Sequence, residues 1–308
     1  MESIINTIVP VFLVILLGHA LRRLGFLPGS LTAPLNRLVY YVAIPAMIFD
    51  SIAGASFELH FRLSVLLGTL GPVLAVFCAA GAVGGILGFP RQERGTFVQN
   101  AAHGNLGYIG FAVSFYFLGE DGLTRATIIA GFLILMQNLL SVIALQAFSP
   151  RRHDQRPGLK GLAAGVVGNP VVLSSMAGIA FNLSGLSLPR ILGRALEIIS
   201  GMALPLALLV IGAGLSFELI RTHLRFVVPS AALKLFVLPG LGLLTYWLLG
   251  LDNSDFLPGL ILLAAPTATV SYVMAAELGG SESQAGAAVS MSTLLSSLTY
   301  TLWLVFVA

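Results

Sequence analysis

Apolar blocks fill most of this sequence, and short stretches rich in charges, prolines or glycines separate them. A helix needs about 20 apolar residues to cross the hydrocarbon core of a bilayer. Blocks of that length predict ten membrane-spanning helices, over residues 4–23, 31–53, 63–88, 95–118, 123–147, 161–183, 189–214, 225–249, 256–278 and 283–307. The predicted fold class is therefore an all-α polytopic membrane protein.

The second half of the pattern repeats the first at a separation of 160 residues. Matching positions include Pro10 and Pro170, Pro45 and Pro205, and the tetrapeptide SFEL at 56–59 and 216–219. Each half, 1–148 and 161–308, holds five predicted spans, so the second half must enter the membrane from the opposite side. We predict two inverted five-helix repeats joined by a linker over 149–160, an architecture typical of secondary transporters.

Composition supports a membrane protein and excludes several other classes. Of 308 residues, 57% are apolar and 9% are charged, whereas about a quarter of a soluble domain is charged. The net charge of +3 is too small for a nucleic-acid footprint. The single cysteine, Cys78, cannot form an intramolecular disulfide.

The distribution of lysine and arginine predicts the orientation, because cytoplasmic loops carry the excess of these residues. With the N-terminus outside, the inner loops hold Arg22, Arg23, Arg91, Arg94, Arg151, Arg152, Arg156, Lys160, Arg221 and Arg225. The outer loops then hold only Arg62, Arg125, Arg190 and Arg194. We therefore expect both termini outside, the linker in the cytoplasm, and a location in the cell membrane, in a bacterium the inner membrane.

Two predicted spans contain residues that interrupt helices. The fourth contains HGNLGYIG at 103–110, and the ninth contains LAAPTATVSYVM at 263–274, in corresponding positions of the repeats. Glycine costs about 1 kcal/mol and proline about 3 kcal/mol relative to alanine inside a helix. Broken backbone inside a membrane requires protein or a water-filled cavity to satisfy it. We expect broken helices 4 and 9 whose half-helices meet near the membrane centre, with unpaired N–H groups that attract an anion such as a carboxylate.

The binding site predicted at these two helix breaks consists of residues at both breaks and on the fifth span. Its members are Asn105, Gly104, Gly107, Pro266, Thr267, Thr269, Gln137 and Asn138, with Ser271 as a further hydroxyl. Close helix packing is the alternative explanation for the glycines, and hydrogen bonds between helices are the alternative for the two amides at 137 and 138. Close helix packing is a better explanation for the glycines of GAVGGILG at 81–88 than for those at 103–110, because the stretch 81–88 has no polar side chain.

Three ionisable residues within predicted spans are candidates for proton coupling: Asp50, His103 and Lys234. Lys234 lies too deep in the eighth span to reach the interface easily, and a charge at such a depth indicates function. A cap-like role for Asp50 and a hydrogen-bonding role for His103 are the alternatives.

Several motifs resemble the auxin efflux carrier family, which includes plant PIN-type carriers and bacterial malonate or malate permeases. They are LNRLVYYVAIPAMIF at 35–49, GNLGYIGF at 104–111, NPVVLSSMAGIAFNLSG at 169–185, MALPLALLVIGAGLSF at 202–217 and APTATVSYVMAAELG at 265–279. The resemblance implies a fold similar to bile-acid sodium symporters, with scaffold helices 1, 2, 6 and 7 and a transport domain of helices 3–5 and 8–10. It also implies that the broken helices 4 and 9 cross, and that Asn105 and Pro266 lie at this crossing, where substrate binds.

The expected function is that of a secondary transporter that moves a mono- or dicarboxylate by alternating access of an elevator type. Sodium symport of the bile-acid type is the alternative, but the sequence PTATVSYV at 266–273 lacks the carboxylate expected of a sodium site. Uniport or proton-linked transport is therefore favoured. An intramembrane enzyme or a channel is the alternative of a different class, although no zinc, serine-hydrolase or phosphate-loop motif is present. We expect no cofactor or metal, the lipid bilayer as surroundings, and a homodimer through the scaffold helices.

Overall fold

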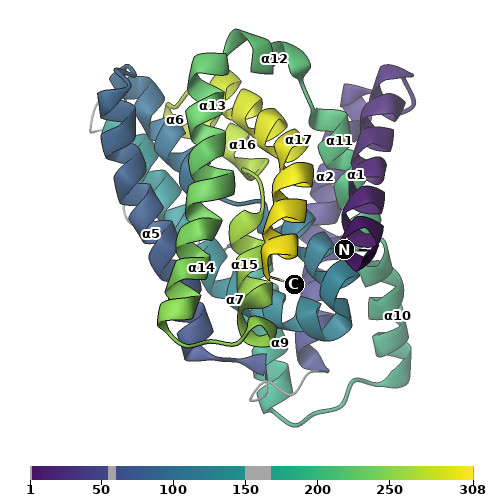
Figure 1. Ribbon diagram of the computed structural model, residues 1–308. Coiled ribbons are helices and arrows are strands. Elements are labelled where there is room, and N and C mark those ends of the chain that lie inside the picture. The colour runs from purple at the N-terminus through teal and green to yellow at the C-terminus, as the bar shows by residue number, and fades with distance from the viewer. Residues whose placement is uncertain (1, 55–59, 150–167, 308) are drawn as a thin grey trace. The chain divides into compact units, whose positions relative to one another are not determined.

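The computed structural model describes residues 2–54, 60–149 and 168–307, and their regular secondary structure is helical apart from one isolated bridge (Figure 1). The helices of the first half are α1 (Glu2–Arg23), α2 (Gly29–Leu38), η1 (Val39–Ala43), α3 (Ile44–Ala53), α5 (Leu63–Ile86), α6 (Arg91–Ala102), η2 (Leu106–Gly110) and α7 (Phe111–Phe148). Those of the second half are α9 (Pro170–Leu183), α10 (Arg190–Gly201), α11 (Ala203–Gly214), α12 (Phe217–Thr222), α13 (Leu224–Ala232), η4 (Leu233–Val237), α14 (Leu238–Leu248), α15 (Asn253–Ala264), α16 (Val270–Leu278) and α17 (Glu282–Val307).

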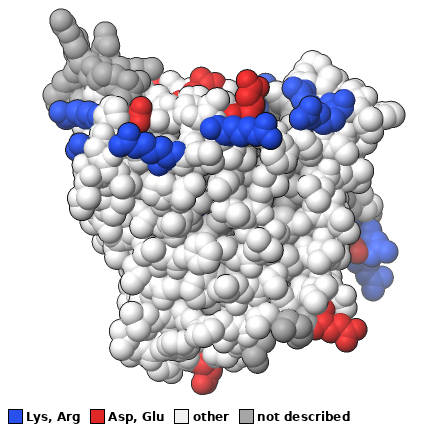
Figure 2. All heavy atoms as spheres, turned by 45° about the horizontal axis from the view of Figure 1, so that its top comes forward, with Lys and Arg blue, Asp and Glu red and all other residues white. Residues whose placement is uncertain are grey.

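Among the described residues, seven helical segments are long and apolar enough to cross a membrane, and α9 and α15 are shorter apolar helices. Figure 2 shows large surface areas without Lys, Arg, Asp or Glu side chains. The prediction of an all-α, multi-pass membrane protein is therefore confirmed. Most of the predicted linker, 149–160, lies outside the described residues.

Two predicted spans are joined more closely than the sequence indicated. The fourth and fifth were expected to be separate, yet α7 runs from Phe111 to Phe148 with one non-helical residue, Gly119. Its φ of 72° lies in the left-handed region that favours glycine. The expected boundary between these spans is thus a single residue where the chain changes direction.

The chain divides into two compact units, each built from both halves of the sequence. Unit 1 comprises residues 1–62, 107–132 and 167–215, and unit 2 comprises 63–106, 133–166 and 216–308. Each unit has its own buried apolar interior, and each is described separately below.

Small residues allow close helix packing in unit 1. A Cβ atom on Gly18 of α1 would collide with the backbone of Leu209 in α11, and one on Gly178 of α9 would lie 3.0 Å from Cβ of Ile52 in α3. Close backbone approach at small residues is the usual way in which helices associate inside a bilayer. Gly18 and Gly178 are 160 residues apart, so equivalent glycines form the contacts α1–α11 and α9–α3.

Aromatic side chains fill the interior of unit 2. Phe89, Phe97 and Phe226 form one cluster, with ring centroids 5.2 to 5.6 Å apart. Tyr246 stacks on Phe256 at 5.0 Å, and its hydroxyl lies 2.7 Å from Oγ1 of Thr69. These contacts hold α14 against α15 and α5, because a buried tyrosine needs both ring packing and a hydrogen-bond partner.

Candidate functional site: the crossing of two broken segments

Two segments of extended chain pair with each other in unit 2. The helix α6 ends at Ala102 and α15 ends at Ala264, and the residues that follow form an antiparallel bridge between Gly104 and Thr267. The Asn105 N–H donates to the Pro266 carbonyl at 2.7 Å, and the Ala268 N–H donates to the His103 carbonyl at 3.0 Å. The two breaks therefore satisfy part of each other's backbone, which a buried non-helical segment requires.

Side chains from neighbouring helices bind the remaining groups of this crossing. The Gly104 N–H donates to Oε1 of Gln137 at 3.2 Å, and the Thr267 N–H donates to Oγ of Ser292 at 3.0 Å. The Thr267 hydroxyl donates to the Asn100 carbonyl in the last turn of α6, also at 3.0 Å. Polar side chains on α7 and α17 and a backbone carbonyl of α6 thus fix the position of both breaks.

The pairing changes the expected source of positive potential. The sequence suggested that unpaired N–H groups would remain at the breaks, but those of Gly104, Asn105, Thr267 and Ala268 all donate within unit 2. The Thr267 hydroxyl, expected as a substrate ligand, already donates to a carbonyl. An anion here must therefore be bound mainly by side chains.

Asn105 provides an open donor at the crossing. Its side chain is 4% exposed, and its Nδ2 atom has no hydrogen-bond partner among the described residues. Leaving a buried donor unsatisfied costs about 1–3 kcal/mol. A ligand that accepts a hydrogen bond from Nδ2 would recover that free energy.

Lys234 of η4 supplies a cation beside the same residues. It is fully buried, and its Nζ atom donates to the Leu263 carbonyl in the last turn of α15 at 2.8 Å. A Cβ atom added to Gly104 would lie 3.3 Å from Nζ, so the lysine passes directly beside the first break. A side chain at 104 would crowd the lysine, so the glycine leaves room for this close approach.

His103 has a hydrogen-bonding role in the structure. Its Nδ1 lies 2.9 Å from Oγ of Ser141, one turn after Gln137 on α7, and its side chain is buried. His103 and Lys234 belong to unit 2, whereas Asp50 belongs to unit 1. The three residues expected to couple protons therefore do not form one group within either unit.

The structure gives several other predicted residues a more peripheral place. Gly107 lies within η2 and belongs to unit 1, where a Cβ atom would lie 3.7 Å from Ile44. Thr269 precedes α16 and makes no side-chain cap there. Asn138 is half-buried on α7, next to Gln137. Among the described contacts, Gln137 binds the break at Gly104 and Asn138 does not.

Sequence reasoning missed two amides on α6. Gln99 and Asn100 are almost fully buried, and neither amide group has a hydrogen-bond partner among the described residues. The Ser271 hydroxyl, which the sequence did suggest, is also buried and unpartnered. Two adjacent amides in the turn before a helix break, in an otherwise apolar chain, were the available signal.

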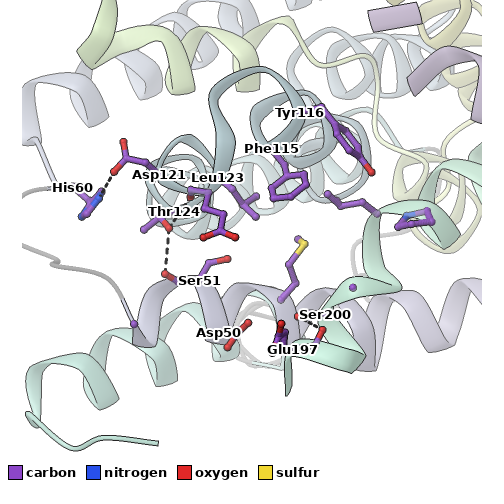
Figure 3. Close-up of a pocket in the computed structure, with 16 residues that line it drawn as sticks. Asp50, Ser51, His60, Phe115, Tyr116, Asp121, Leu123, Thr124, Glu197 and Ser200 are labelled. Carbon is purple, nitrogen blue, oxygen red and sulfur yellow. Dashed lines mark hydrogen bonds and ion pairs between the residues drawn. The ribbon is translucent and has the colours of Figure 1, made fainter. Parts of the chain in front are cut away.

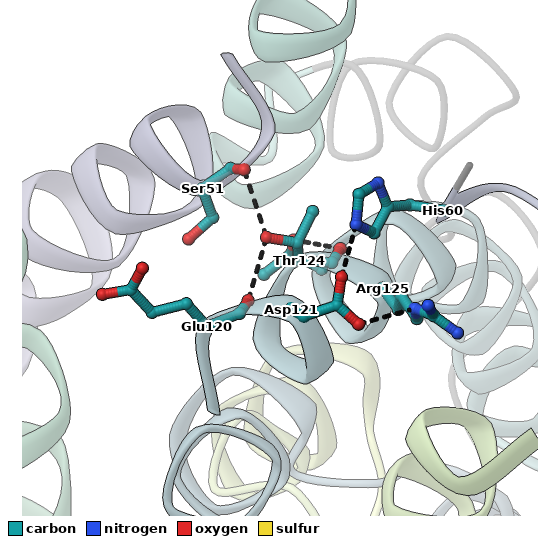
Figure 4. Close-up of polar contacts among 7 residues, drawn as sticks. Ser51, His60, Glu120, Asp121, Thr124 and Arg125 are labelled. Atoms are coloured by element: carbon teal, nitrogen blue, oxygen red, sulfur yellow. Dashed lines mark hydrogen bonds and ion pairs between the residues drawn. The ribbon is translucent and has the colours of Figure 1, made fainter. Parts of the chain in front are cut away.

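Asp50 lines a separate cavity of about 640 Å³ within unit 1 (Figure 3). Asp50, Glu120 and Glu197 give its walls a negative character, and Glu197 pairs with Arg194 at 2.8 Å. At another wall, Asp121 contacts His60 at 2.6 Å and Arg125 at 3.0 Å (Figure 4). Carboxylates disfavour an organic anion, so the crossing in unit 2 is the better anion site.

Comparison with protein families identifies the chain. The model of a family described as membrane transport protein matches residues 3–304. The chain belongs to this family. The prediction that it resembles auxin efflux carriers and malonate permeases is confirmed, since this is the family that contains them. The protein is thus a transporter and not an enzyme.

Curated relatives of this transporter extend over nearly its whole length. A protein of Rhizobium meliloti named "Putative malonate transporter" is 28% identical over 98% of this chain and 95% of the relative. An "Uncharacterized transporter" of Methanothermobacter thermautotrophicus is 27% identical over 97% of this chain and 96% of the relative. Transport is therefore the common description of the matched proteins.

Proposed function

We propose that this transporter carries a small mono- or dicarboxylate across the membrane by alternating access, with the anion bound at the crossing in unit 2. The observation that carries the proposal is the buried, unpartnered Nδ2 donor of Asn105 beside the broken segments that Lys234 contacts. A donor and a cation are the groups that a carboxylate requires. The name of the Rhizobium relative supports malonate as the first substrate to test.

We further propose that the two halves are inverted repeats. Glycines with positive φ occur in pairs at equivalent positions: Gly25 and Gly185, Gly88 and Gly250, and Gly119 and Gly279. Their separations are 160, 162 and 160 residues, and the ends of α6 and α15 are also 162 residues apart. Turns and breaks that recur at one separation support a repeated fold, and inverted repeats provide alternating access about one site.

The two compact units suggest how the transporter moves. Unit 2, which contains both breaks, is the proposed transport domain, and unit 1, which contains α1, α2, α3, α9, α10 and α11, is the proposed scaffold. Residues 107–132 belong to unit 1, although the resemblance assigned the whole fifth span to the transport domain. We propose an elevator-like displacement of unit 2, a homodimer through the scaffold, and a bacterial inner-membrane location with both termini outside.

The proposed energy source is the substrate gradient or a proton gradient. The ninth-span break carries threonines where sodium symporters of this fold carry a carboxylate, which disfavours a coupled sodium ion. Asp50, His103 and Lys234 are the first residues to neutralise if transport responds to pH. His103 lies within hydrogen-bonding distance of Ser141, and Lys234 donates to the Leu263 carbonyl.

Counterflow in proteoliposomes tests the function. Vesicles loaded with unlabelled malonate should accumulate labelled malonate transiently and saturably, and succinate and acetate should compete to different extents. Flux that is linear with concentration and shows no counterflow would indicate a channel. An absence of malonate flux together with counterflow of another carboxylate would change the substrate but retain the carrier.

A further inference from the structure

A smaller cavity of about 280 Å³ lies within unit 2, away from the crossing, where α6 and α13 begin beneath α12 (Figure 1). Its polar lining comes from Glu93, Thr222, His223, Arg225 and Gln284. Its volume is just below the range of about 300–1,000 Å³ that is typical of sites for whole small molecules. It is suited to a small polar group.

One side of this cavity is electropositive. The helix α6 starts after Pro90 and α13 starts after His223, and neither start has a side-chain cap. Such helix N-termini carry about half a positive charge each and bind phosphate groups. Arg225 adds a full charge, and one of its N–H groups donates to the Leu87 carbonyl at 3.0 Å, which holds the side chain in place.

The lining also offers acceptors that need a donor. Gln284 is 6% exposed, and its Oε1 atom has no hydrogen-bond partner among the described residues. Glu93 lies in the first turn of α6, and its half-buried carboxylate forms no ion pair in the described part of the chain. Its negative charge offsets the positive start of α6, so the electropositive part of the cavity is the start of α13 with Arg225. A buried acceptor without a donor is costly, so a ligand should carry N–H or O–H groups for Glu93 and Gln284, in addition to an anionic group for Arg225.

Apolar surfaces show how such a ligand could be attached to the membrane. The phenyl rings of Phe89 and Phe226 line the cavity and pack on the buried Phe97. Leu224 and Val228 lie one turn apart on α13 with about half of each side chain exposed. Their spacing places both on one face of the helix, a path along which an acyl chain can lie.

We propose that this cavity, the headgroup site, binds a phospholipid whose headgroup contains a phosphate and a primary ammonium, as in phosphatidylethanolamine. The phosphate lies at the start of α13 beside Arg225, and the ammonium donates to Gln284 and to Glu93 in the first turn of α6. The basic residues that begin α6 and α13 belong to the predicted cytoplasmic loops, so the lipid occupies the inner leaflet. This inference is independent of the substrate at the crossing.

Lipid competition on the purified, full-length transporter tests the site. Detergent-solubilised protein receives phosphatidylethanolamine, phosphatidylcholine or phosphatidylglycerol with matched acyl chains, or inorganic phosphate alone, and native mass spectrometry counts bound lipid while a thermal scan follows Tm. We expect phosphatidylethanolamine to bind at least about tenfold more tightly than phosphatidylcholine, whose quaternary ammonium has no N–H donor, because a charge-assisted hydrogen bond is lost. Glu93→Gln should abolish this preference, and Arg225→Gln should weaken both lipids.

Arg221→Gln is the matched control, because Arg221 is a neighbouring basic residue that does not line the cavity. It should preserve the preference for phosphatidylethanolamine. Equal binding of the two lipids by the wild type, or an unchanged preference in monodisperse Glu93→Gln, would overturn the proposal. Full stabilisation by inorganic phosphate or by phosphatidylglycerol would also overturn it, since either would show a site for phosphate alone.

Discussion

The Lys234 ammonium donates a 2.8 Å hydrogen bond to the carbonyl of Leu263, in the last turn of the broken helix α15. Carbonyls in a last turn have no partner within their own helix and form the negative end of its dipole. A lysine there compensates this end, and the same ammonium lies beside Gly104 of the other break. One buried cation is thus next to both segments of the crossing.

Lys234→Met should weaken carboxylate binding by at least about tenfold, since a charged partner of the anion is removed. The fold should survive, because the lost hydrogen bond, worth about 1 kcal/mol, is offset by relief from burying a cation. Isothermal titration with malonate, beside a gel-filtration profile, measures both effects. Lys234→Arg keeps the charge and should retain more affinity than Lys234→Met; wild-type affinity in the methionine variant would remove Lys234 from the site.

Asn105→Ala should also reduce affinity by about tenfold or more, if a charge-assisted hydrogen bond of about 1.5–3 kcal/mol is lost. Because Nδ2 has no partner among the described residues, the substitution breaks no bond of that donor in the empty protein, and Tm should change little. Asn138→Ala is the control, as Asn138 is half-buried nearby. Equal losses in both variants would argue against a specific contact of Asn105 with the substrate.

The sequence predicted the location of both breaks because glycine and proline interrupt helices through local geometry. HGNLG directly follows the end of α6 at Ala102, and APTAT contains the extended residues after α15. The bridge between Gly104 and Thr267 was not predictable in the same way. The bridge joins residues that are far apart in the sequence. Because the two segments hydrogen-bond to each other, fewer backbone N–H groups remain without an acceptor than in an isolated break.

Buried side chains of the site were predicted unevenly for a similar reason. Gln137 was expected near the break and binds the Gly104 N–H, whereas Gln99 and Asn100 were overlooked. Inside a membrane span an amide can serve either packing or function. Only the surroundings of each amide distinguish a packing role from a functional one. The headgroup site depends in the same way on two helix starts that are distant in the sequence.

Transport should persist when sodium is replaced by potassium on both sides of the proteoliposome membrane. The proposed likeness to bile-acid sodium symporters would place a carboxylate at the ninth-span break, where this chain has Thr267 and Thr269, and the Thr267 hydroxyl already donates to the Asn100 carbonyl. Initial rates of malonate uptake in matched sodium and potassium buffers measure the effect. A requirement for sodium would show that the transporter is an ion-coupled symporter.

The orientation can be tested with cysteines in a Cys78→Ala background. Ser187→Cys and Asp252→Cys, both at exposed positions in predicted outer loops, should react with an impermeant thiol reagent in intact cells. Thr222→Cys, exposed in a predicted inner loop, should react only after permeabilisation. These positions avoid Gly119, whose positive φ would strain a cysteine. The opposite labelling pattern would reverse the assigned topology.

Pro266→Ala should lower turnover more than affinity. The Pro266 carbonyl accepts the 2.7 Å hydrogen bond from Asn105, which requires that α15 stop at Ala264. Alanine is favoured over proline by about 3 kcal/mol within a helix, so α15 can extend through the break and separate the paired segments. Pro258→Ala removes a proline inside α15 without touching the crossing and is the matched control. Counterflow rates should therefore fall in Pro266→Ala and stay near wild type in Pro258→Ala; equal rates in both variants would mean that the proline does not maintain the crossing.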